Sequence, residues 1–191
     1  MKRATLLIVS LALLVFRVHA QSPDTKEAFQ MTAVVLYNRI ADFEARSPGA
    51  EVLAPFIKQL SAKAATHWKD SKPGPGRNGL IAVAIRPNRT MKLWVDVDRE
   101  FQPDITASLQ KEMKAVDVPQ VINAPIAFAL YFSLWGGNPK TKADNNGIEI
   151  PQSWRKAAKG HGKPMLIPDD ILPLVWKTTR YGTDVPRSQK L

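Results

Sequence analysis

Three carboxylate residues, Asp96, Asp98 and Glu100, are spaced two positions apart in the sequence. In an extended strand this spacing places their side chains on one face, where three converging oxygens can bind Ca²⁺ or provide an acid–base pair. A hydrolase of cell-wall polymer is therefore one candidate function, and it requires one carboxyl with a raised pKa that can donate a proton. The alternative is a solvated strand face, since carboxylates are common there and Lys92 lies in the same row.

The remaining residue patterns do not form a catalytic motif. His67 and His161 are the histidines beyond the N-terminal segment, and neither has partners at a metal-ligand spacing. The stretch from Asp144 to Glu149 is similar to a calcium loop in composition, but its glycine and glutamate do not fit the spacing of such loops. Nucleophile-elbow and phosphate-binding glycine motifs are absent from the sequence. We therefore predict no catalytic residue, no metal ligand and no cofactor.

A basic region with an aromatic residue in its midst occupies the C-terminal part of the chain. Its members are Lys140, Lys142, Trp154, Arg155, Lys156, Lys159 and Lys163. Cations beside an aromatic ring can bind phosphate or stack on a planar group. This region is the candidate partner-binding surface for an acidic partner, with binding that weakens as salt screens the charges. The alternative is a solvated charged face, with Trp154 anchored in the core.

The N-terminus has the three regions of a secretory signal peptide. Lys2 and Arg3 precede an apolar run from Leu6 to Phe16, and small residues before Gln21 suit a cut after Ala20. The run is shorter than the roughly 20 apolar residues that a membrane-spanning helix needs. We therefore predict a periplasmic or secreted protein with no transmembrane segment after removal of the signal. An uncleaved signal anchor is the alternative.

Composition limits the partners and the means of stabilisation. The chain has no cysteine, so the exported domain depends on its hydrophobic core rather than on disulfides. The formal net charge of +10 attracts anionic partners. Outside the cytoplasm these are acidic lipid head groups, envelope polysaccharide or a partner protein. Nucleic acid is not expected, because an exported protein seldom meets it.

The first half of the mature chain has helical periodicity. Apolar residues at spacings of three and four predict one helix from Asp24 to Arg46 and a second from Ala50 to Trp68, which Pro55 either kinks or begins. Together they form a predicted helical hairpin within residues 21–70. Residues 71–79 are rich in proline and glycine, which predicts a linker.

After residue 79 the periodicity changes to two, which is typical of strands. Leu80–Arg86 and Met91–Val97 form a predicted hairpin with one face buried, a helix begins at Pro103, and Ile126–Leu134 is a strand packed closely on both sides. The predicted fold class is therefore α+β: the helical hairpin, then a small antiparallel β-β-α-β sheet with a helix packed on it in residues 80–135. Residues 136–191 are a basic, loop-rich extension on the same core, with short helices at Gln152–Lys159 and Asp169–Lys177.

Residues 79–134 resemble the C-terminal domain of TonB-type energy transducers. The residues behind the resemblance are Gly79, Val83, Ile85, Pro87, Val95, Pro119, Pro125, Ile126, Ala127 and Phe128. The resemblance implies an antiparallel sheet with a helix on one face, which binds extended peptides of outer-membrane transporters by pairing along a sheet edge. TonB-type proteins keep an uncleaved membrane helix and a long proline-rich spacer, which this chain lacks, so energy transduction is not expected.

The leading hypothesis is a non-enzymatic envelope protein that binds a protein or peptide partner. The binding surface is either a sheet edge within residues 80–134 or the basic C-terminal region. The alternatives are the hydrolase that uses Asp96, Asp98 and Glu100, and a protein that binds acidic membrane surfaces through its positive charge.

Overall fold

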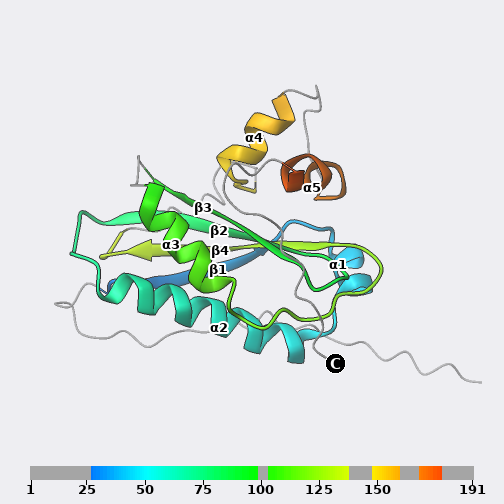
Figure 1. Ribbon diagram of the computed structural model, residues 1–191, viewed down its shortest axis with the longest axis horizontal. Helices are drawn as coiled ribbons and strands as arrows, with labels where there is room; N and C mark the ends of the chain where they lie inside the picture. The colour runs from blue at the N-terminus through cyan, green and yellow to red at the C-terminus, as the bar shows by residue number, and fades with distance from the viewer. Residues whose placement is uncertain (1–26, 99–102, 138–147, 160–167, 178–191) are drawn as a thin grey trace, which may run out of the picture.

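The fold combines one antiparallel sheet with helices on both of its faces (Figure 1). The computed structural model describes residues 27–98, 103–137, 148–159 and 168–177. The elements in chain order are β1 (Gln30–Leu36), α1 (Ile40–Arg46), α2 (Ala50–Lys69), β2 (Arg77–Ile85), β3 (Met91–Val97), α3 (Pro103–Met113), β4 (Ile126–Leu134), α4 (Gln152–Lys159) and α5 (Pro168–Lys177). The predicted α+β class is confirmed.

The strand order in the sheet is β1-β4-β2-β3, and every neighbouring pair is antiparallel. The predicted β-β-α-β unit is formed by β2, β3, α3 and β4, and β4 returns beside β2 rather than beside β3. In the centre of the sheet Ile81 lies opposite Leu130 of β4 and Val95 of β3. Both edges of β4 are therefore paired within the chain, and the outer strands are β1 and β3.

The central strands β2 and β4 carry large apolar residues on one face and alanines on the other. Ile81, Val83 and Leu130 are completely buried on the first face, while Ala82 and Ala127 are completely buried on the second. A strand that is covered on both faces has a nearly continuous apolar sequence, because neither set of side chains meets water. The prediction that β4 is packed on both sides is confirmed.

The helix predicted from Asp24 to Arg46 is wrong within the described residues. Gln30–Leu36 is the strand β1, and only Ile40–Arg46 is helical. The β-branched side chains of this run favour a strand, and the run gains a ladder of hydrogen bonds by pairing with β4. The described residues 27–70 therefore contain a strand followed by two helices, rather than a helical hairpin.

The long helix α2 is confirmed and forms the first layer with α3. Its buried residues recur at three and four as a single stripe: Leu53, Phe56, Leu60, Ala64 and Trp68. Pro55 is the sixth helical residue, so the helix begins before it. The predicted linker of residues 71–79 is shorter than expected, because Arg77–Gly79 already pair within β2.

The second face of the sheet is covered by α4 and α5, whose helical character was predicted. The indole of Trp94 on β3 meets the rings of Trp154 and Trp176 edge-on, at centroid distances of 5.1 and 6.3 Å. Trp154 and Trp176 are 1% and 3% exposed. The expectation of a hairpin with one buried face is therefore wrong, because Lys92 and Trp94 lie in a second core between the sheet and these helices.

Two charged residues of β3 hold the ends of the covering helices. The buried Lys92 donates from Nζ to the carbonyl oxygens of Val175 (2.9 Å) and Trp176 (2.6 Å) in the last turn of α5. The carboxylate of Asp96 accepts a hydrogen bond from the backbone N–H of Gln152, the first residue of α4. Each charge has the sign that the helix end favours, since N–H groups are unpaired at the start of a helix and carbonyls at its end.

An ion pair ties α5 to α1. Arg46 donates to both carboxylate oxygens of Asp169, with an Nη1–Oδ1 distance of 2.7 Å and an Nη2–Oδ2 distance of 2.9 Å. The same guanidinium donates to the carbonyl oxygen of Pro125 just before β4. The hydrogen bond from Arg46 holds the pKa of Asp169 below its ordinary value.

Replacing Lys92 with methionine removes the charged donor while keeping most of the buried stem. We expect the free energy of unfolding to fall by about 2–4 kcal/mol, because two helix-end carbonyls lose a charged hydrogen-bond donor. Urea denaturation measures the loss, and Lys156→Met on the exposed face of α4 is the control, with a change within about 0.5 kcal/mol. Equal stability of the two variants would contradict the role of Lys92.

The Arg46–Asp169 pair predicts a loss of stability in acid. The pKa of Asp169 is lower in the folded protein than its ordinary value of about 3.9. The ion pair therefore makes its full contribution to the free energy of unfolding above that ordinary pKa, and this contribution is lost as the pH falls through the pKa of the folded state. The Asp169 side chain is 43% exposed, so the contribution is about 0.5–1 kcal/mol. Denaturation of the wild type and Asp169→Asn near neutral pH and near pH 3 measures it, and the difference between the two proteins should be smaller at the lower pH. A constant difference between them would contradict the prediction.

Candidate functional site

The two outer strands differ in how much of them is covered. On β3 the run Met91–Trp94 is buried, and α3 lies beside this strand (Figure 1). None of the residues of β1 is buried, and the side chain of Val34 is 41% exposed. The strand β1 is therefore the open edge of the sheet.

The pairing of β1 with β4 determines which of its backbone groups face outward. Just beyond the strand, Tyr37 donates its N–H to the carbonyl oxygen of Ala127 at 3.0 Å. In an antiparallel pair every second residue bonds inward, so Val35 and Ala33 bond to β4 while Val34 and Leu36 direct N–H and C=O away from it. No other segment in the described part of the chain pairs with these outward groups.

A bulge and a side-chain bond limit the open edge at its two ends. The register shifts between Met31 and Ala33, where Thr32 is the extra residue, and such a bulge bends the strand locally. At the other end the buried side chain of Asn38 accepts a hydrogen bond from the N–H of Ala127 at 2.6 Å, which replaces the next rung of the ladder. The regular part of the open edge therefore comprises residues 33–37. We call this stretch the β1 edge.

The β1 edge lacks most of the features that prevent strands from pairing with other chains. Gln30–Leu36 contains no charged residue and no proline, and its Thr32 bulge is the protection it carries. Edge strands in natural proteins are commonly protected by lysine, proline, bulges or a covering segment. An apolar, uncharged and uncovered edge is a template for another strand.

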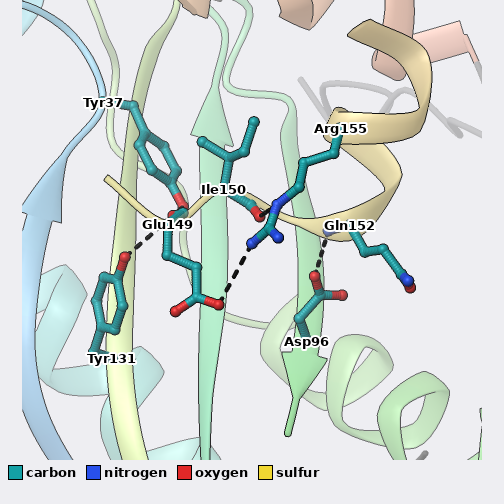
Figure 2. A network of polar contacts seen from close by, with 7 residues as sticks. All are labelled: Tyr37, Asp96, Tyr131, Glu149, Ile150, Gln152 and Arg155. Atoms are coloured by element: carbon teal, nitrogen blue, oxygen red, sulfur yellow. Dashed lines mark hydrogen bonds and ion pairs between the residues drawn. The ribbon is translucent and has the colours of Figure 1, made fainter. Parts of the chain in front are cut away.

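A polar network on the second face supports this edge (Figure 2). The hydroxyls of Tyr37 and Tyr131 both donate to the carbonyl oxygen of Glu149, at 2.9 and 3.1 Å. Burial raises the pKa of both tyrosines above the ordinary value, so both remain protonated donors. Arg155 donates to the carbonyl oxygen of Ile150 at 3.2 Å and pairs with the Glu149 carboxylate at 3.4 Å. The segment before α4 is thus fixed across the strands.

The structure does not assemble the predicted basic surface from the residues that it describes. Lys140, Lys142 and Lys163 lie outside the described residues. Trp154 is in the second core, with its ring 5.2 Å from that of Tyr37. The members of the predicted basic region that lie at the surface of α4 are Arg155, Lys156 and Lys159. Arg155 is engaged with the Glu149 segment, which leaves Lys156 and Lys159 as the exposed cations of this helix.

The described members of the predicted carboxylate row, and the described histidine, have structural partners. Asp96 bonds to the start of α4, Asp98 accepts a 3.4 Å bond from the side-chain amide of Asn78, and Glu100 lies outside the described residues. His67 Nδ1 is 2.9 Å from the Glu112 carboxylate, which joins α2 to α3, and His161 also lies outside the described residues. Among the residues that the structure describes, no three His, Cys, Asp or Glu side chains converge on a metal site.

The residues that define the open edge were missed by the sequence analysis, which assigned them to a helix. One signal for a strand was present: Thr32, Val34 and Val35 are β-branched within a run that has no charged residue. No local pattern predicts the hydrogen bond between Asn38 and Ala127, because the two residues are far apart along the chain.

The fold and this edge define an α+β protein with a two-sided sheet and an outer strand, β1, with which no further described segment pairs. Comparison of the chain with models of protein families, with curated proteins and with solved structures found no match. None of the helices in the described ranges is long and apolar enough to cross a membrane.

Hydrogen exchange tests the geometry of the β1 edge. We expect the amide protons of Val34 and Leu36 to exchange at least about tenfold faster than that of Val35, because unbonded edge amides are open to water while ladder amides are not. Residue-resolved exchange followed by NMR in the isolated protein measures these rates. Protection of Val34 equal to that of Val35 would show that another segment covers the edge.

Proposed function

We propose that this chain is an exported, non-enzymatic binding protein that accepts an extended segment of a partner protein along the β1 edge. The added segment becomes a fifth strand, and its backbone bonds to the outward groups of Val34 and Leu36. The observation that carries the proposal is that β1 has no buried residue and no pairing partner on its outer side among the described residues. Strand addition of this kind takes its affinity from main-chain hydrogen bonds and its specificity from alternate side chains.

Two features of the sequence support the proposed location in the envelope and the proposed mode of binding. The N-terminal pattern that ends at Ala20 favours export to the envelope. The resemblance of residues 79–134 to TonB-type C-terminal domains favours the same mode of binding, since that family binds extended peptides along a sheet edge.

The hydrolase alternative loses support from the contacts of its main candidate. The carboxylate of Asp96 is occupied by the first backbone amide of α4 and so anchors that helix. A general acid must instead be free to donate a proton to a bound substrate.

The exposed Lys156 and Lys159 keep the basic C-terminal surface as a second candidate. The two surfaces differ in how binding responds to salt. Strand addition to the uncharged β1 edge depends mainly on main-chain bonds, whereas binding to exposed cations is screened within roughly 8–10 Å. A partner whose affinity falls steeply with salt, and which is lost in Lys156→Glu/Lys159→Glu, belongs to the basic surface.

Proline at position 34 tests the proposal directly. Val34→Pro removes an outward N–H and leaves the inward ladder to β4 in place, because proline is tolerated on edge strands whose N–H faces solvent. Peptides are first selected from a display library of seven-residue sequences on the wild-type protein. We expect their dissociation constants, measured by calorimetry, to rise about 10- to 100-fold in the variant, since each peptide carbonyl left unpaired costs about 1–3 kcal/mol.

Val35→Pro is the matched control for the fold. It removes an inward donor to β4, so it should lower the free energy of unfolding by about 1–3 kcal/mol, while Val34→Pro remains close to the wild type. Selected peptides that bind the wild type and Val34→Pro equally well would refute strand addition at this edge.

A further inference from the structure

The open groups of the β1 edge are arranged evenly about its midpoint, Val35. Val34 and Leu36 direct their backbone N–H and C=O outward, while Val35 between them bonds to β4. The N–H of Tyr37 again bonds inward, to the carbonyl oxygen of Ala127. A stretch with this arrangement can pair with a copy of itself in antiparallel orientation, about a two-fold axis beside Val35.

One register of such a pair uses the outward groups of both residues. Val34 of one copy then lies opposite Leu36 of the other, and each of the two equivalent pairs exchanges two backbone hydrogen bonds. A shift of two residues in one direction would place Leu36 opposite Thr32 in the bulge. The same shift in the other direction would place Val34 opposite Asn38, whose side chain ends the ladder. The backbone of the edge therefore favours the register centred on Val35.

This register brings apolar side chains together on both faces of the sheet. Val34 and Leu36 lie on the face of the first core, since their β4 neighbours Leu130 and Phe128 belong to that core. On the other face Val35 of one copy lies opposite Val35 of the other. In a single copy Val34 is 41% exposed, and Val35 and Leu36 are partly exposed. Cross-strand contacts between aliphatic side chains stabilise an antiparallel pair, so a second copy would cover apolar surface that otherwise meets water.

The distribution of charge over the two outer strands favours a closed pair of copies. Gln30–Leu36 has no charged residue, so two copies of β1 meet without like charges opposite each other. The outer strand β3 carries Lys92 and Asp96, and its first four residues are buried. Charges on an outer strand oppose pairing with a further strand, so β1 is not expected to add to β3 of another copy. A contact that uses the same surface on both copies closes at two.

We infer that a second copy of this chain occupies the β1 edge when no partner segment is bound, so that the two four-stranded sheets join across a two-fold axis at Val35. The dimer needs only the open edge. Its regulatory role rests on the proposed function, because the second copy and the partner segment compete for the outward groups of Val34 and Leu36. A partner must then separate the two copies before it can bind.

Single introduced cysteines test which residues meet, because the chain has no cysteine of its own. In the inferred register the two Val35 residues form a non-hydrogen-bonded pair, with Cα atoms about 4.5 Å apart, which suits a disulfide. Ala33→Cys is the matched control on the same face of the strand. The two copies of residue 33 would lie about 14 Å apart along the ladder, too far for a disulfide. We expect Val35→Cys to form a covalent dimer at least about tenfold faster under mild oxidation, as measured by non-reducing electrophoresis.

Analytical ultracentrifugation of the protein without cysteine measures the equilibrium. We expect a reversible dimer whose dissociation constant rises about 10- to 100-fold in Val34→Pro, because each copy loses one outward N–H. Lys156→Met on α4 should leave this constant unchanged. Added salt should not dissociate the dimer, because the edge is uncharged and salt screens the repulsion between two copies of net charge +10. A dimer that dissociates as salt rises would depend on ion pairs and would contradict the inference.

The outcomes separate this inference from the proposed function. A monomer at every concentration, with equal crosslinking of Val35→Cys and Ala33→Cys, would overturn the inference, and strand addition would stand if Val34→Pro still weakens the selected peptides. A dimer that Val34→Pro dissociates, in a protein that binds no selected peptide, would support the second copy and refute the proposed function. Where both are observed, a selected peptide should convert the dimer to a peptide-bound monomer. A peptide that binds and leaves the dimer intact would refute the competition.

Discussion

The antiparallel pairing of β4 on both of its edges is the constraint from which the rest of the architecture follows. Ile126–Leu134 lies between β1 and β2, with the odd and even sets of side chains buried in two different cores. A strand in this position is apolar at nearly every residue, and helices cover both of its faces. Because β1 fills the side of β4 that β2 leaves free, β1 becomes one of the two outer strands, and none of its residues is buried.

The second core shows how charged residues can be placed under helices. Lys92 is 6% exposed, a position in which an unpaired ammonium group would cost several kcal/mol. The carbonyl groups at the end of α5 supply its partners, and the first amide of α4 supplies the partner of Asp96. Trp94 lies between these two residues on the strand and packs against both helices. Lys92 and Asp96, which lie on the same face of β3, are therefore structural attachments for α5 and α4.

The sequence predicted the elements whose periodicity is unambiguous and misassigned those that depend on distant partners. The alternation in Met91–Val97 and Ile126–Leu134 predicted strands, and the apolar stripe of α2 predicted a helix. Gln30–Leu36 is apolar at nearly every position, so spacings of three and four fit it as well as a period of two does. Its pairing with β4, almost a hundred residues later, decides between them. The same limit applies to the candidate site, since an open edge is defined by what the rest of the chain leaves unpaired.

The bulge in β1 is consistent with a site for a short partner segment rather than for unlimited association. A long, flat, apolar edge promotes aggregation, and natural proteins interrupt such edges. Here the extra residue at Thr32 bends one end of the strand, and Asn38 closes the other by bonding to Ala127. The regular part between them, residues 33–37, offers the outward groups of Val34 and Leu36, which suffices for an extended segment of about five residues at about 3.4 Å each. Tyr37 and Tyr131 hold the Glu149 segment on the second face of the same strands, and the strand addition proposed above would lose less conformational entropy at an edge that is supported in this way.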